Sequence, residues 1–212
     1  MPHDLLPEFL TLASMHALAM IAPGPDFALV IAQSVRQGRA AGIWIAAGIA
    51  AGLSVHILYT VLGVGALMHA LPWLLNVARA LGAAYIAWIA LHMMRAKPAS
   101  LDPANNGAGV PQDSARKLFL MGFFTNATNP KVTLFFLAIF TSVVSAQTPL
   151  IVQAGYGLWM CMLNMIWFSL VATLFSGKAV RQAFLRLGHW FERLMGLLLM
   201  LFALRLIADI IR

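Results

Sequence analysis

Long apolar stretches constrain this chain more than any other feature. They cover roughly residues 9–35, 42–67, 71–94, 118–143, 150–175 and 189–210. About 20 apolar residues cross the hydrocarbon core of a bilayer, because the core is about 30 Å thick and a helix rises about 1.5 Å per residue. Helices satisfy their own backbone hydrogen bonds in lipid, whereas a β-barrel would need shorter, alternating segments. The sequence therefore predicts an all-α integral membrane protein with six transmembrane helices.

Composition supports this class and argues against several others. The chain is 61% hydrophobic and 10% charged, whereas soluble domains are near 45–50% and about 25%. The net charge of +7 does not indicate a nucleic-acid partner, because the basic residues are scattered between the apolar stretches. Cys161 is the single cysteine and no two histidines have metal-ligand spacing. We therefore expect no metal site, no cofactor and no enzymatic activity.

The positions of lysine and arginine predict the orientation. Ten of the 14 basic residues lie between the first and second stretches, between the third and fourth, or in the segment 178–193 that leads into the sixth. Cytoplasmic loops carry an excess of lysine and arginine. We therefore expect a multi-pass protein of the cell inner membrane, in contact with lipid, with both termini outside the cytoplasm.

A polar segment at residues 95–117 divides the chain into halves. It is rich in proline, glycine and charged residues, which is typical of a linker. We expect a single transmembrane domain over residues 1–212, made of a first three-helix repeat at 1–94, this cytoplasmic linker, and a second repeat at 118–212.

The first apolar stretch contains Pro23-Gly24-Pro25-Asp26. Proline removes a helical hydrogen bond and clashes with the preceding turn, so two prolines around a glycine should interrupt the helix. Pro25 suits the first position of a new half-helix. The amides of Phe27, Ala28 and Leu29 are then expected to lack partners, and the positive end of the half-helix would attract a carboxylate.

The fourth stretch contains a matching motif, Asn129-Pro130-Lys131, with Asn129 as a helix cap. Pro25 and Pro130 are 105 residues apart, about half of the 212-residue chain. Three helices per half place the second half in the membrane with opposite direction, which predicts an inverted 3+3 repeat with interrupted helices 1 and 4. Asp26 and Lys131 follow the equivalent prolines, and we hypothesise that they face one cavity and pair there without substrate. The alternative is two proline kinks whose charges reach toward the headgroups.

These motifs resemble those of the LysE/RhtB family of amino-acid exporters. The first signature is the run at 23–26 and the second is the run at 126–131, which includes Asn126. Gly48-x3-Gly52-x3-His56, Gly63-x-Gly65 and Gly82-Ala83-Ala84-Tyr85 also resemble the family pattern. The resemblance covers nearly the whole chain outside the linker. It implies six helices in an inverted repeat and efflux of amino acids or their derivatives, driven by the proton gradient.

Four other residues are candidates for the site, and three of them have an alternative role. His56 either couples protons or packs in the second helix. Arg79 either holds a substrate carboxylate or extends to the outer headgroups. Tyr85 either donates a hydrogen bond into a cavity or packs between helices, and Asn126 offers both donors and acceptors to a substrate.

The function expected from these features is export of a small amino acid, with protons as the coupling ion. The substrate carboxylate would dock at the half-helix N-termini beside Lys131, and Asp26 would bind the ammonium or the proton. Two alternative interpretations are an exporter of another small solute or cation, and a non-transporting membrane scaffold. For the scaffold, Asp26→Asn would leave the function intact. The sequence leaves open whether a homodimer forms.

Overall fold

The structure of the chain is a computed structural model. It describes residues 5–22, 24–70, 72–95, 112–145 and 147–177, and further along residues 189–190, 193–194, 196–201 and 203–208. At some positions inside helices it describes the backbone alone. These positions include Arg79, Tyr85 and Pro130.

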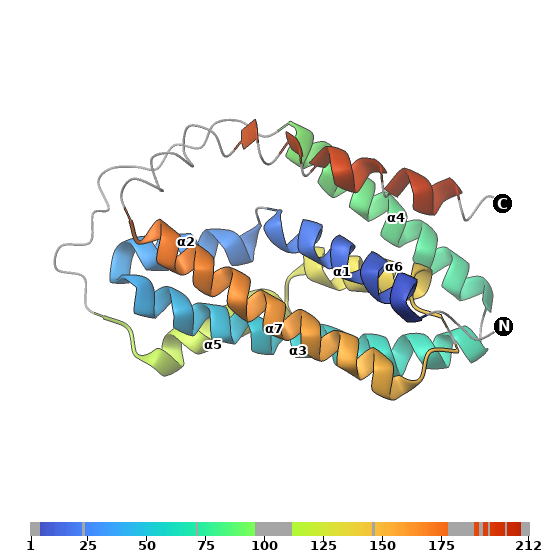
Figure 1. The fold of residues 1–212 in the computed structure, drawn as a ribbon, viewed down its shortest axis with the longest axis horizontal. Coiled ribbons are helices and arrows are strands. Elements are labelled where there is room, and N and C mark those ends of the chain that lie inside the picture. Colours follow the sequence, from blue (N-terminus) through green and yellow to red (C-terminus); the bar gives the residue numbers. More distant parts are fainter. Residues whose placement is uncertain are drawn as a thin grey trace.

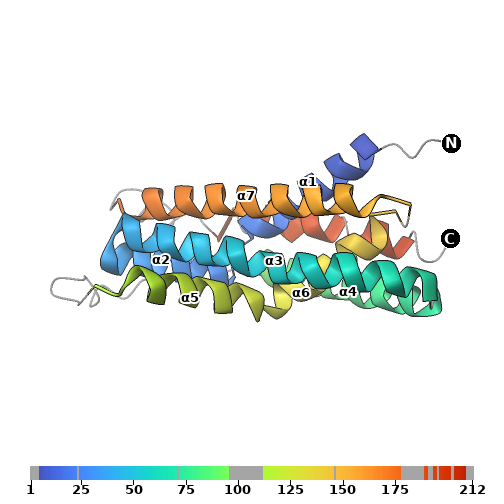
Figure 2. The ribbon, with the colours of Figure 1, turned by 90° about the horizontal axis from the view of Figure 1, so that it is seen from below.

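The described residues form helices and contain no strand, as predicted for an all-α protein. The helices lie side by side along one long axis (Figures 1 and 2). In chain order they are α1 (Leu5–Ile21), α2 (Pro25–Gln37), α3 (Arg39–Ala70), α4 (Pro72–Met94), α5 (Ala115–Ala127), α6 (Pro130–Ser142) and α7 (Leu150–Phe175). A further apolar helical segment, Gly196–Ala208, packs on α4 through Gly196.

Two stretches of the described residues, Arg39–Gly63 and Leu150–Phe175, are each long and apolar enough to cross a membrane. The bent pair of α1 and α2 adds a third candidate span. Helix α6 and the segment Gly196–Ala208 are apolar but shorter than a full span. The described structure thus agrees with a membrane protein, while the six spans and their inverted repeat stay predictions.

Both proline motifs coincide with helix breaks. Helices α1 and α2 meet at a bend of 51°, and Gly24 is the N-cap that precedes Pro25. In the second motif Asn129 is the N-cap of α6, and its side chain accepts a hydrogen bond from the amide of Lys131 at 3.0 Å. The capping residue and the following proline thus end one helix and start the next, as the sequence predicted.

Glycines allow α3 and α5 to approach closely. A Cβ added to Gly48 would collide with the carbonyl oxygen of Phe119, and a Cβ on Gly52 would lie 2.6 Å from the carbonyl oxygen of Phe123. Gly122 of α5 faces the backbone of Ile45 in the same way. Small residues permit such backbone contact in membrane helices. The crossing places the end of α5, where the second break begins, against the middle of α3.

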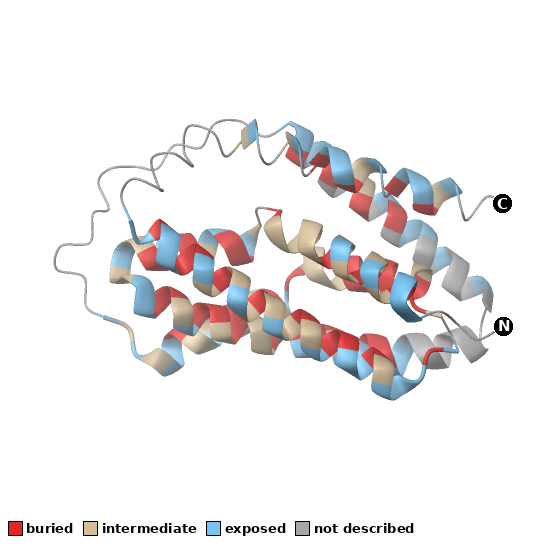
Figure 3. Ribbon diagram, in the orientation of Figure 1, coloured by how far each residue is buried: buried red, intermediate tan, exposed pale blue. Residues whose placement is uncertain are grey.

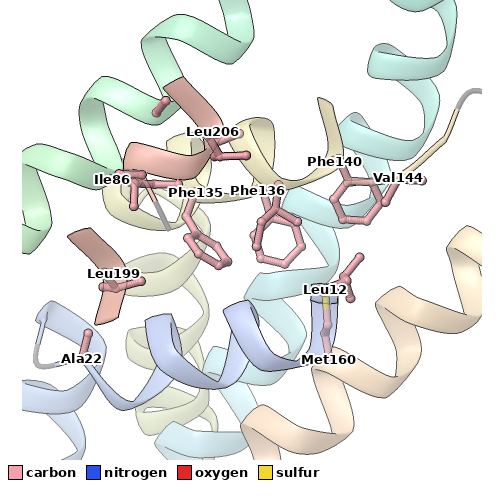
Figure 4. Packing of buried hydrophobic residues seen from close by; sticks show 14 of the residues in the cluster. Leu12, Ala22, Ile86, Phe135, Phe136, Phe140, Val144, Met160, Leu199 and Leu206 are labelled. Atoms are coloured by element: carbon pink, nitrogen blue, oxygen red, sulfur yellow. The ribbon is translucent and has the colours of Figure 1, made fainter. Parts of the chain in front are cut away.

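The buried core lies between the two broken helices and α3, α4 and α7. Phe136 and Phe140 of α6 point toward Leu12 of α1 and Met160 of α7, and Phe135 belongs to the same cluster (Figure 4). Buried positions face the inside of the bundle and exposed positions face outward (Figure 3). Large apolar side chains are exposed along α3, α4 and α7. An outer surface of this kind suits lipid better than water.

Candidate functional site

The two helix breaks lie against each other near the middle of the bundle (Figure 1). The ammonium of Lys131, at the start of α6, donates a hydrogen bond of 2.8 Å to the carbonyl oxygen of Ala22, just beyond α1. Carbonyls at a helix C-terminus carry partial negative charge, so that a cation is stabilised there. Gly24 keeps this approach open, because a Cβ at that position would lie 3.3 Å from Lys131 Nζ.

The side chains of Asp26 and Asn126 form a second contact between the two helix breaks. Asn126 Nδ2 donates a hydrogen bond of 2.8 Å to Asp26 Oδ2, and the two side chains are buried, with 9% and 1% of their surfaces exposed. Asp26 Oδ1 and Asn126 Oδ1 are buried without a hydrogen-bond partner among the described residues. A buried acceptor without a partner costs about 1–3 kcal/mol. The pair is therefore suited to accept hydrogen bonds from a bound donor.

The N-termini of the two half-helices differ. Asn129 caps α6, whereas Gly24 gives α2 no side-chain cap. The prediction that the Ala28 amide lacks a partner is wrong, because Ala28 N donates to Gly24 O at 2.9 Å. Gly24 is the N-cap, and the N-cap carbonyl accepts the first hydrogen bond of the helix. The positive end of α2 is thus confined to its first turn, which carries Asp26.

These groups line a cavity of about 50 Å³. A cavity needs at least about 10–15 Å³ to hold one water molecule, so this cavity is large enough for a small polar group. Its apolar walls come from α1, α2, α3, α6 and α7. The polar side chains that line it are His16, Asp26, Asn126, Asn129, Lys131 and Asn164.

Half of the twelve sequence-predicted site residues lie together in this cavity. Gly24, Asp26, Phe27, Asn126, Asn129 and Lys131 line it. Pro25 and Pro130 are at the starts of α2 and α6. Pro23 lies outside the described residues, as do the side chains of Arg79, Tyr85 and Pro130.

His56 lies behind the cavity rather than among the residues that line it. Its Nε2 is 2.9 Å from the backbone oxygen of Asn126, and its Nδ1 is 2.9 Å from Tyr59 Oη. Because a carbonyl oxygen only accepts, Nε2 donates and Nδ1 accepts from the tyrosine hydroxyl, which a neutral imidazole satisfies. This arrangement positions the end of α5, and with it the Asn126 side chain.

Two cavity residues, His16 of α1 and Asn164 of α7, were not among the predicted site residues. Each is a polar residue inside an apolar stretch, which was a usable signal in the sequence. Neither belongs to a proline motif, and only the packing of α1 against α7 brings them together.

The cavity combines both signs of charge within a short distance. A cation, Lys131, and the uncapped N-terminus of α2 lie beside an acidic side chain, Asp26, and an amide oxygen of Asn126. Such an arrangement is complementary to a small zwitterion, whose carboxylate and ammonium groups would each find an opposite partner.

Comparisons with known proteins identify relatives of the chain. The family described as LysE type translocator matches residues 17–209. The threonine efflux protein of Escherichia coli K12 is 29% identical over 206 residues, which cover 96% of this chain and 98% of that protein. The leucine efflux protein of Klebsiella pneumoniae is 30% identical over 144 residues, or 67% and 66% of the two chains. An uncharacterized membrane protein of Pseudomonas aeruginosa is 30% identical over 197 residues, or 91% and 87%. No solved structure matches the chain.

Proposed function

Since the chain belongs to the LysE type translocator family, we propose that it exports a small amino acid across the cell inner membrane in exchange for protons. One observation carries the proposal. Two buried acceptors without partners, Asp26 Oδ1 and Asn126 Oδ1, belong to residues that line the same cavity as the Lys131 side chain. The names of the relatives make threonine and leucine the first substrates to test.

The ammonium of the substrate binds at Asp26 and Asn126. An ammonium carries three donors and no acceptor. Asp26 Oδ1 and Asn126 Oδ1 are acceptors without partners and can accept two of its hydrogen bonds. The carboxylate of Asp26 supplies the negative charge, and Asn126 Nδ2 holds its other oxygen at 2.8 Å. Hydrogen bonds to charged groups contribute about 1.5–3 kcal/mol each, so this end supplies a large share of the affinity.

The carboxylate of the substrate binds at the first turn of α2. That turn has no side-chain cap, and helix N-termini favour anions. Lys131 Nζ is close to Gly24, which is the N-cap of this turn. The ammonium of Lys131 turns from the Ala22 carbonyl oxygen to the substrate carboxylate, which exchanges a neutral acceptor for a charged one.

Asp26 also explains how export would be coupled to protons. The carboxylate of Asp26 holds either the substrate ammonium or a proton, but not both. Release of the substrate outside leaves the carboxylate to be protonated, and the proton is delivered to the inside when the next substrate displaces it. Competition for one carboxylate thus produces an exchange of one proton for one substrate molecule.

The charge of the two ends of the bundle supports the proposed orientation in the membrane. Arg36 and Arg39 lie where α2 meets α3, and Arg116 and Lys117 lie in the first turn of α5 at the same end (Figure 1). This end is placed in the cytoplasm. Leu5, at the start of α1, and the connection between α6 and α7 are at the opposite end, which faces outside.

Export from cells loaded with dipeptides tests the function. Cells that carry the protein and cells that lack it are fed threonine-, leucine- and glycine-containing dipeptides, and internal and external amino acids are followed with time. We expect faster release of at least one of these amino acids from cells with the protein. Equal release of every amino acid would refute the proposed export.

Variants of the cavity then test the site. Asp26→Asn and Lys131→Ala are each expected to lower the export rate at least tenfold, because a charged partner of the substrate is lost. Asp113→Asn and Lys117→Ala are matched controls, since they remove the same charges from an ion pair at the start of α5, outside the cavity. Unchanged export by both cavity variants would show that the substrate binds elsewhere.

A further inference from the structure

The cavity contains a second polar region that the proposed roles of Asp26 and Lys131 leave unused. His16 of α1 and Asn164 of α7 both line the cavity, and 3% and 4% of their surfaces are exposed. His16 lies six residues before Ala22, which corresponds to roughly 9 Å along a helix. His16 is therefore displaced along α1 from the Lys131 contact, within the same cavity.

His16 has hydrogen-bonding capacity to spare. Its Nε2 is buried and has no partner among the described residues. The ring donates a hydrogen bond to the backbone of Met160 through its other nitrogen, so that Nε2 of the neutral ring is an acceptor. The ring centroid is 6.2 Å from that of Phe136 and 6.3 Å from that of Trp159. A polar atom held between aromatic rings, without a partner, costs free energy unless a ligand supplies the missing hydrogen bond.

Asn164 complements this histidine. It lies near the middle of α7, a helix whose other residues are mostly apolar. A neutral imidazole has one donor and one acceptor, and a carboxamide has both kinds of atom. Together the two side chains match a hydroxyl group, which also donates and accepts. A methyl group of the same size would leave both side chains without a partner.

We propose that His16 and Asn164 are specificity-determining residues, which bind a hydroxyl group on the side chain of the exported amino acid. The inference rests on the proposed export function and assigns the polar region between α1 and α7 to the substrate side chain. Phe136 and Phe168 line the cavity beside the pair, and their rings limit the size of the group that fits. Hydrogen bonding to His16 and Asn164 thus favours substrate side chains with a hydroxyl group, and the two aromatic rings exclude larger substrate side chains.

Threonine and valine provide the sharpest comparison, because they differ by a hydroxyl in place of a methyl group. Loss of a hydrogen bond that leaves buried groups without partners corresponds to about a 5- to 150-fold change in an equilibrium constant. We expect the wild-type protein to transport threonine faster than valine by a factor in this range. Replacing either His16 or Asn164 with leucine removes the unpaired polar group, so the preference should shrink.

The experiment uses the purified full-length protein in proteoliposomes. Initial efflux rates of threonine and valine are measured at equal, low internal concentrations for the wild-type protein, His16→Leu and Asn164→Leu. His16→Gln keeps a side chain that donates and accepts, and it should retain most of the preference. Thr173→Val is the matched control, because Thr173 is an exposed residue of α7 whose hydroxyl binds its own helix.

The expected result is a threonine-to-valine ratio that falls at least fivefold in His16→Leu and in Asn164→Leu, with the valine rate maintained. Equal rates for threonine and valine in the wild-type protein would overturn the inference. An unchanged ratio in Asn164→Leu, or a loss of both rates in proportion in each leucine variant, would overturn it as well. A wild-type protein that transports no amino acid would instead refute the export function itself, so the two failures are distinguishable.

Discussion

A close backbone contact between α3 and α5 predicts a strong effect of one added methyl group. In Gly48→Ala the new Cβ would overlap the carbonyl oxygen of Phe119 and lie 2.8 Å from the amide nitrogen of Phe123. Neither backbone atom can rotate aside, so the helices must separate by on the order of 1 Å to restore van der Waals distance. Overpacking costs about 1–3 kcal/mol, and contact with backbone places Gly48→Ala in the upper half of that range.

The same displacement reaches the candidate site. Asn126 follows Phe123 by one turn of α5, and its Nδ2 is 2.8 Å from Asp26 Oδ2. A shift on the order of 1 Å would lengthen this contact beyond the usual limit of about 3.2 Å for a hydrogen bond. We therefore expect Gly48→Ala to lower the export rate as well as the stability of the fold.

Thermal unfolding of the purified protein in detergent measures this effect. A loss of about 2–3 kcal/mol corresponds to a melting temperature lower by about 4–12 °C for a chain of this length. Gly63→Ala is the control in the same helix, because a Cβ there meets nothing within 4 Å and alanine favours a helix by about 1 kcal/mol. Equal melting temperatures for Gly48→Ala and Gly63→Ala would refute the reasoning.

Two further predictions concern opposite ends of the bundle. The buried Glu8 carboxylate accepts hydrogen bonds of 2.9 Å from Ser145 N and Thr148 Oγ1. We therefore expect Glu8→Ala to lower the free energy of unfolding by about 2–4 kcal/mol, measured by thermal unfolding. An unchanged melting temperature would contradict this prediction. At the other end, hydrogen bonds from Lys117 and Gln37 hold the pKa of Asp113 below its ordinary value of 3.8. A carboxyl group with a lowered folded-state pKa stabilises the fold above its unfolded pKa and loses that contribution as the pH falls through the folded value. Asp113→Asn should therefore be less stable than the wild-type protein at neutral pH, and the difference should vanish in acid below 3.8; a difference independent of pH would count against these contacts.

The sequence predicted the features that local chemistry determines. Pro25 and Pro130 mark the starts of α2 and α6, and Asn129 is the cap that the motif indicated. The fifth apolar stretch coincides with α7 at both ends. Proline geometry and capping act within a few residues, so they can be recognised without knowledge of the fold.

Features that depend on packing between distant segments were beyond the sequence. Nothing near Lys131 indicates that its ammonium contacts the carbonyl oxygen of Ala22, 109 residues away. Likewise, His16 and Asn164 have no common motif, and their proximity follows from the packing of α1 and α7. The Gly48-x3-Gly52 spacing is typical of close contact between membrane helices, but only the structure identifies α5 as the partner.

Efflux of labelled threonine from proteoliposomes, with and without an inward proton gradient, tests the role of Asp26 most directly. The wild-type protein, Asp26→Asn and the control Asp113→Asn are compared at the same internal threonine concentration. We expect the gradient to accelerate efflux by the wild-type protein and by Asp113→Asn. Asp26→Asn should be at least tenfold slower and insensitive to the gradient. Efflux by Asp26→Asn that still accelerates with the proton gradient would contradict the account.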